Sequence, residues 1–298
     1  MMKKNKNRQG DRVIVIAIIL VLCSGLAHAF WNLFTKTSNN KIVFLWSIHI
    51  VSFVLLLPYF VIEVAQASIP LQGYLLILLS MAFQMAYFLL LPYVYSHGDM
   101  SQVYPIMRGT GALLVPLFSV WVYRESMSAA GWVGVGCIVA GMFALGGFLG
   151  KERRSAAALR GITPALLVGL CITGYVMTDK MVLHYISPVS LIEVSNIAYA
   201  IVLTPTVIRA GSKLKEEWRA NARTILLGTF LSPGSYLLFL FAVQMAPLSH
   251  LAPIREISTV FGAMLGVLLL KEAGGARRIA LSAVITTGVI MIGLWGNP

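Results

Sequence analysis

The segment SQVYPIMRGTGALLVPLFSVWVYRE, residues 101–125, is long and apolar enough to cross a membrane, yet it carries Arg108 near its start. A helix of about 20 apolar residues spans the roughly 30 Å hydrocarbon core of a bilayer. The guanidinium group stays charged at every physiological pH, and placing it in a membrane helix costs about 2.5–3.5 kcal/mol on insertion scales. We therefore expect Arg108 to face protein, water or a ligand rather than lipid.

The same order of residues returns in the second half of the chain. Residues 249–272 read SHLAPIREISTVFGAMLGVLLLKE, so that Arg108 corresponds to Arg255. A second match relates GLAHAFWNLFTK (25–36) to GLCITGYVMTDK (169–180). Repeats of half the chain length in an apolar protein are typical of secondary transporters.

The composition excludes a water-soluble globular protein. The chain is 58% hydrophobic and 11% charged, with a mean hydropathy of +0.82, whereas soluble domains carry about 25% charged residues. The net charge of +12 indicates contact with anionic lipid headgroups, because the basic residues gather in the tail and loops, and we expect no nucleic acid partner. The three cysteines lie in apolar runs without metal-ligand spacing, so neither a disulfide nor a metal site is predicted.

Ten apolar runs have the length of membrane helices. We expect an all-α integral membrane protein with ten transmembrane helices arranged as a 5+5 inverted repeat, because an odd number of spans per half reverses the second half. The predicted division is a basic tail (1–12), a first repeat (13–149), a linker (150–160) and a second repeat (161–298). The expected spans are 13–34, 42–62, 71–95, 101–123, 129–149, 161–183, 188–208, 225–245, 250–270 and 279–295. Small residues spaced as GxxxG, at Gly262 and Gly266 and similarly at Gly136 and Ala140, indicate close helix packing.

The membrane orientation is not predicted, because two charge patterns conflict. The basic tail favours a cytoplasmic N-terminus. Ten spans would then place the basic linker and the basic 209–223 loop on the opposite side. The orientation of the termini therefore stays open.

Polar side chains share one face of two predicted helices. His28, Trp31 and Asn32 are spaced at i, i+3 and i+4, as are Tyr175 and Asp179 at i and i+4. Such a stripe either lines a cavity or bonds neighbouring helices.

Charged residues within spans are expensive and therefore suggest function. Tyr104 and Arg108 flank Pro105 and its missing N–H, where we expect a kink or an interruption of the helix. Arg108 is expected either to bind substrate or gate, or to form a structural salt bridge, and Arg255 has the same alternatives. Glu193 is expected either to carry a proton or to pair with one of these arginines.

Four motifs resemble the EamA family of the drug/metabolite transporter superfamily. They are HxxWNxxxK (28–36), GDxSxxYPIxRGTG (98–111), GYxxxDK (174–180) and LAPIREISxVFGAxxGxxxLKE (251–272). The resemblance extends over almost the whole chain and implies a ten-helix inverted-repeat carrier with a central cavity, which moves small metabolites by alternating access. It implies cavity positions at His28, Trp31, Asn32, Tyr104, Arg108, Tyr175, Asp179 and Arg255.

We expect a secondary active transporter, an exporter or exchanger, in the plasma or inner membrane. Arginine suits carboxylate and phosphate groups, so two intramembrane arginines favour an anionic or zwitterionic solute such as an amino acid, a carboxylate or an organophosphate. Protons are a candidate coupling ion, with Glu193 or Asp179 as the coupling site. The alternatives are a proton-coupled exporter of cationic or amphipathic drugs and a lipid-headgroup translocase.

The sequence predicts no enzyme and no bound cofactor. The histidines are isolated, so they form no catalytic set, and the chain has no P-loop motif, so ATP does not drive it directly. The substrate, the direction of transport and the oligomeric state are not predicted.

Overall fold

Helices form almost all of the computed structural model, which describes residues 2–97, 100–145, 156–269 and 275–296. Within these ranges no β-strand is present. The helices are α1 (Met2–Thr37), α2 (Lys41–Gln66), α3 (Leu71–His97), α4 (Met100–Tyr123), α5 (Ala129–Leu145), α6 (Ala156–Val182), α7 (Pro188–Ala210), α8 (Lys213–Met245), α9 (Leu248–Arg255), α10 (Ile257–Leu268) and α11 (Gly275–Trp295). The expected all-α class is confirmed.

The apolar lengths and the outer surface of the bundle fit a membrane. Among the described residues, seven helices are long and apolar enough to span it, and α5 and α11 are shorter apolar helices. Large apolar side chains such as Val54, Ile208 and Phe230 are 63–75% exposed on the outside. Such a surface suits lipid, and the helices satisfy their own backbone hydrogen bonds there. The chain is therefore a multi-pass membrane protein.

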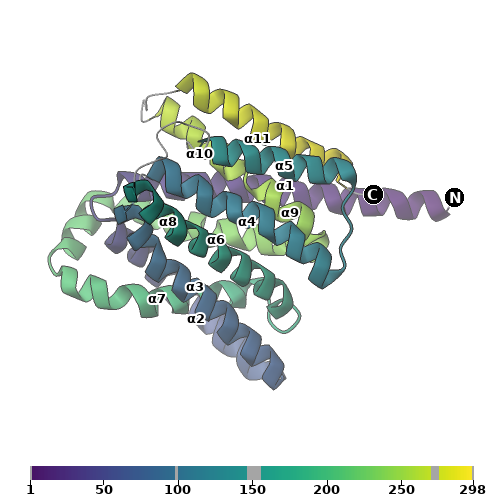
Figure 1. The fold of residues 1–298 in the computed structure, drawn as a ribbon. Coiled ribbons are helices and arrows are strands. Elements are labelled where there is room, and N and C mark those ends of the chain that lie inside the picture. Colours follow the sequence, from purple (N-terminus) through teal and green to yellow (C-terminus); the bar gives the residue numbers. More distant parts are fainter. Residues whose placement is uncertain (1, 98–99, 146–155, 270–274, 297–298) are drawn as a thin grey trace.

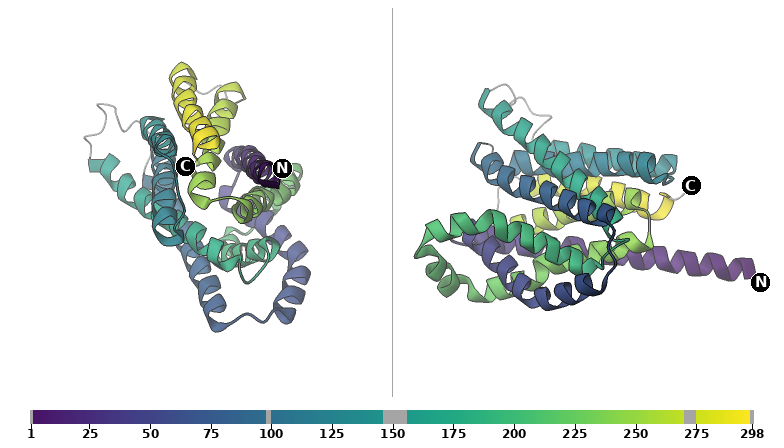
Figure 2. Two further views of the ribbon diagram at one scale, coloured as in Figure 1. Left: turned by 90° about the vertical axis from the view of Figure 1, so that its right-hand side faces the viewer. Right: turned by 90° about the horizontal axis from the view of Figure 1, so that it is seen from below.

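The packing of the helices relates the two halves of the chain. Helix α3 packs against α6, and its counterpart α8 packs against α1. Helices α2 and α7, and likewise α5 and α11, pack against their own counterparts. Helix α1 begins and α11 ends at the same end of the bundle (Figure 1), as an even number of crossings requires. The start of α1 extends beyond the other helices (Figure 2).

Two carboxylates fasten the starts of α7 and α2 to neighbouring helices. Ser187, the N-cap of α7, donates its backbone N–H to Glu63 of α2 at 2.7 Å. In the reciprocal contact, Asn40, the N-cap of α2, donates its backbone N–H to Glu217 of α8, also at 2.7 Å. The first N–H groups of a helix have no partner within the helix, so each carboxylate satisfies one and also suits the helix dipole.

The predicted ninth span is divided, and this division positions the site. Helix α9 ends at Arg255 and α10 starts at Ile257. The N–H of Glu256 bonds to the carbonyl of Pro253 at 3.0 Å, a tighter i−3 turn that replaces the regular helical bond. Helix α4, in contrast, is continuous through Pro105, so the interruption expected in the first half is found in the second.

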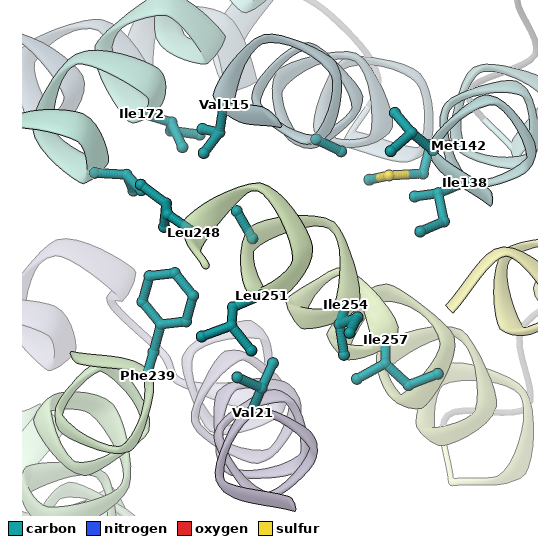
Figure 3. Packing of buried hydrophobic residues seen from close by; sticks show 14 of the residues in the cluster. Val21, Val115, Ile138, Met142, Ile172, Phe239, Leu248, Leu251, Ile254 and Ile257 are labelled. Atoms are coloured by element: carbon teal, nitrogen blue, oxygen red, sulfur yellow. The ribbon is translucent and has the colours of Figure 1, made fainter. Parts of the chain in front are cut away.

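Helix α9 lies in the centre of the hydrophobic core. Figure 3 shows its Leu248, Leu251 and Ile254 between Val21 of α1 and Phe239 of α8 on one side and Val115 and Ile172 on the other; all seven belong to one buried cluster. The break after Arg255 therefore falls deep inside the protein.

Candidate functional site

A cavity of about 70 Å³ lies among the buried side chains of the bundle. Its wall combines arginine, histidine and aromatic rings with small polar groups. The lining residues are His28, Trp31, His49, Tyr87, Phe88, Arg108, Tyr175, Ile192, Ser195, Asn196, Tyr199, Ser232, Pro233, Ser235, Tyr236 and Arg255.

Arg108 lines the cavity and forms a two-point ion pair with Glu256. Its Nε donates to Oε2 at 2.9 Å, and Nη2 lies 2.8 Å from Oε1. Both side chains are less than 10% exposed. The structural salt bridge that was one alternative for Arg108 is present, and its partner comes from the break between α9 and α10. The carboxylate balances the charge of Arg108.

Arg255 has a different environment. Its guanidinium carbon lies 4.9 Å from the ring centre of Tyr236 and 4.5 Å from that of Phe239, so two aromatic faces support the charge. The Nε atom is buried and has no hydrogen-bond partner among the described residues. Arg255 thus brings a buried cation with an unused N–H donor to the cavity wall.

Asp179 lies behind the cavity wall rather than on it. Its two carboxylate oxygens accept hydrogen bonds from Ser80 of α3 and from the hydroxyl of Tyr236 of α8. Tyr236 itself lines the cavity and supports Arg255. Asp179 is therefore linked to the cavity through one tyrosine.

Glu193 is also removed from the cavity by one residue. It is fully buried, and its Oε2 accepts a hydrogen bond from the side-chain amide of Asn196 at 3.0 Å. Its Oε1 has no partner among the described residues. The expected alternative of a static pair with Arg108 is wrong, because Arg108 pairs with Glu256, and no ion pair joins Glu193 to Arg255 among the described side chains.

The polar stripe of α1 both lines the cavity and forms a hydrogen bond within the protein, the two alternatives expected of it. His28 and Trp31 line the cavity, with ring centres 4.9 Å apart, and the Trp31 Nε1 is buried with no described partner. Asn32 instead donates to the carbonyl of His28 at 2.8 Å, within its own helix. Tyr175 of α6 lines the cavity beside Tyr236, at 6.0 Å between ring centres. The side chain of Tyr104 lies outside the described residues.

Several lining residues were not predicted, and four of them are aromatic. Tyr87 and Phe88 of α3, Tyr199 of α7 and Tyr236 of α8 sit in apolar runs without a charge or a polar stripe to single them out. His49 and Asn196 carry a usable pattern: at the repeat offset of 144, His49 aligns with Glu193 and Ser52 with Asn196. All four meet in one hydrogen-bonded cluster.

In the described chain no group of three or more His, Cys, Asp or Glu residues could hold a metal ion.

The comparisons with known proteins agree with this architecture. Residues 159–294 match the model of the EamA-like transporter family. Twenty-six chains of solved structures also match. One of them, described only as the crystal structure of a protein, superposes with a TM-score of 0.71 at 14% identity, over 95% of this chain and 98% of its own, which shows a shared fold.

No curated protein matches the sequence. The family match covers the second half of a chain whose first half repeats its motifs, within a bundle of apolar helices. Residues 159–294 are therefore an EamA-like transporter domain, and the chain that carries it is a multi-pass membrane transporter of the drug/metabolite type rather than an enzyme.

Proposed function

We propose that this transporter moves a small polar organic solute with a carboxylate or phosphate group, and that Arg255 binds that group. The observation that carries the proposal is the buried guanidinium on the cavity wall with an unused Nε–H. A buried donor without a partner costs about 1–3 kcal/mol, and a buried cation costs more. An anionic group of the solute would remove both costs at once.

The charges around the cavity favour an anion over a cation. Arg108 is balanced by Glu256, so Arg255 leaves an excess positive charge at the wall. A drug exporter for cations would need a carboxylate exposed to the cavity. Asp179 and Glu193 are both separated from it by an intervening side chain, which argues against that alternative.

We infer transport by alternating access, because the cavity lies among buried side chains of the bundle and the two halves of the chain pack around it. The helices around the cavity would then separate to load the solute. We place the protein in the plasma or inner membrane. For coupling to protons, Asp179 and Glu193 remain the two candidates, since each reaches the cavity through one hydrogen-bonded neighbour.

The test is ligand-dependent thermal stability of the detergent-purified protein, because a solute that binds the folded form raises the apparent melting temperature. A panel would contain carboxylates, amino acids, organophosphates and lipophilic cations. We expect anionic or zwitterionic members to stabilise the wild type by about 2.7 kcal/mol at a hundred times their dissociation constant. Arg255→Gln should abolish this effect.

The matched control is Arg209→Gln, because Arg209 lies at the exposed end of α7. It should bind the same solutes as the wild type. Stabilisation by lipophilic cations alone, or full anion binding by Arg255→Gln, would contradict the proposal.

A further inference from the structure

A buried hydrogen-bonded cluster connects α2 to α7 beside the cavity. The amide nitrogen of Asn196 donates to Glu193 Oε2 at 3.0 Å and to Ser52 Oγ at 3.1 Å. Its amide oxygen lies 3.0 Å from Nδ1 of His49. All four side chains are at most 6% exposed, so each hydrogen bond is made away from water.

These contacts fix which nitrogen of His49 carries the proton. The amide nitrogen of Asn196 faces both Glu193 and Ser52, so its amide oxygen faces His49. A carbonyl oxygen only accepts hydrogen bonds, so Nδ1 of His49 must be the donor. The ring forms no ion pair among the described residues, and burial favours its neutral form. Nε2 is then left as an acceptor.

This weakly bonded acceptor, Nε2 of His49, belongs to the cavity wall. Both His49 and Ser232 line the cavity, and the Ser232 hydroxyl lies 3.5 Å from Nε2, which is the outer limit of a hydrogen bond. Tyr199 packs edge-on against the imidazole, with ring centres 4.2 Å apart, and so holds its plane. A stronger donor in the cavity could replace the hydroxyl without moving the ring.

We propose that His49 is a specificity-determining residue whose Nε2 accepts a hydrogen bond from the transported solute. With Arg255 binding the anionic group, the site then selects solutes that also carry a donor, such as an ammonium or hydroxyl group. The favoured class is amino or hydroxy acids rather than plain carboxylates. Asn196 and Glu193 are positioning residues that act through His49. The inference rests on the proposed Arg255 site.

The orientation of His49 is tested without any solute. The chain has five histidines, and nitrogen-15 NMR of imidazole-labelled protein at mildly alkaline pH separates their neutral tautomers. We expect an Nδ1–H signal that is lost in His49→Gln and shifted toward the Nε2–H form in Asn196→Leu; any Nδ1–H signal of His184, whose Nδ1 faces the Met181 carbonyl, should persist in both variants. A wild-type His49 in the Nε2–H form or charged at that pH would overturn the proposal.

Specificity is tested with two sets of matched solutes. One set is L-alanine, L-lactate and propionate, and the other is L-phenylalanine, L-phenyllactate and 3-phenylpropionate. Within a set whose donor-bearing members stabilise the wild type, we expect the plain carboxylate to bind at least about tenfold more weakly, because it leaves Nε2 of His49 with only the long 3.5 Å contact to Ser232. His49→Asn retains an amide donor near the Nδ1 position but has no atom at Nε2, so it should lose the discrimination.

The control is His184→Asn, since His184 is exposed beyond the end of α6. Equal binding of the plain carboxylate by the wild type, or discrimination retained by His49→Asn, would overturn the role of His49 while leaving Arg255 intact. If no anionic solute of the wider panel binds in an Arg255-dependent manner, the proposed function fails instead. The tautomer measurement still decides the orientation of His49 in that case.

Discussion

At the scale of single residues, the ion pair between Arg108 and Glu256 keeps two buried guanidinium groups in one cavity. Glu256→Gln would leave Arg108 and Arg255 without a balancing carboxylate. Removing one member of a buried pair costs about 3–5 kcal/mol. We therefore expect a lower free energy of unfolding, measured by thermal or chemical denaturation, and a larger stabilisation by added anions than in the wild type.

The comparison for this prediction is Glu216→Gln, at an exposed position near the start of α8. It should leave stability and anion response unchanged. In the double variant Arg108→Leu/Glu256→Leu, which removes both charges, most of the stability should return. A Glu256→Gln protein as stable as the wild type would show that the pair contributes nothing.

The sequence predicts which residues are unusual better than it predicts their partners. Arg108 was expected to avoid lipid because of its cost in a span, and it does. Its partner Glu256 is 148 residues away in the chain, and the repeat aligns Arg108 with Arg255 rather than with Glu256. Glu256 follows Arg255 directly in the sequence, but this does not predict the contact between Glu256 and Arg108. Adjacent side chains in a helix point in different directions.

At the scale of helices, Glu125, which follows the end of α4, joins the end of α6 to the start of α9. It accepts a hydrogen bond from Lys180 at the end of α6 and from the backbone N–H groups of Leu248 and Ser249 at the start of α9. We call these four residues the Glu125 junction. Glu125→Gln removes the charge from both contacts and should lower the free energy of unfolding by about 1–3 kcal/mol. Denaturation of the purified variant at neutral pH would measure this.

The same junction makes stability depend on pH. Burial raises the pKa of Glu125, but the bond from Lys180 and the backbone bonds from Ser249 and Leu248 outweigh it, so the pKa lies below its ordinary value of 4.5. The folded state binds this proton less readily than the unfolded state. The stabilisation is therefore complete above the ordinary pKa and is lost as pH falls through the folded value. Stability curves of the wild type and Glu125→Gln should converge in acid; a constant gap would contradict this.

Helix contacts show where sequence motifs mislead. The small-residue patterns indicated close packing at Gly262 and Gly136, yet a Cβ atom added at either would meet nothing within 4 Å. The close approach occurs at Gly134 of α5 and Gly288 of α11, where an added Cβ would lie 2.5–2.8 Å from the carbonyl oxygen of the other. A short small-residue motif does not by itself show which helix packs against it. The tertiary arrangement decides which glycines lie at a close helix contact.

At the scale of the whole molecule, the internal repeat predicts more than the helix count. It relates Trp31 to Tyr175 and Arg108 to Arg255, and these four residues do line one cavity. The repeat could not predict the aromatic part of the wall, because Tyr199 and Tyr236 have no matched motif. It also could not predict the division of the ninth span, since both halves carry the same proline before the arginine.

The Glu125 junction lies at the end of the bundle where α1 begins and α11 ends (Figure 1), so it ties α4, α6 and α9 together at one face of the membrane. If it helps to close the cavity at this face, Glu125→Gln should open the cavity toward that side alone.

A single cysteine at Ser195 would report access to the cavity, because Ser195 lines it. The native Cys23, Cys137 and Cys171 would be replaced. We expect a membrane-impermeant maleimide to label Ser195→Cys faster in the Glu125→Gln protein, only from the side of an N-terminal epitope tag, which also establishes the orientation. Glu216→Gln should leave the rate unchanged, whereas a rise from both sides would indicate general loosening and no rise would remove the junction from gating.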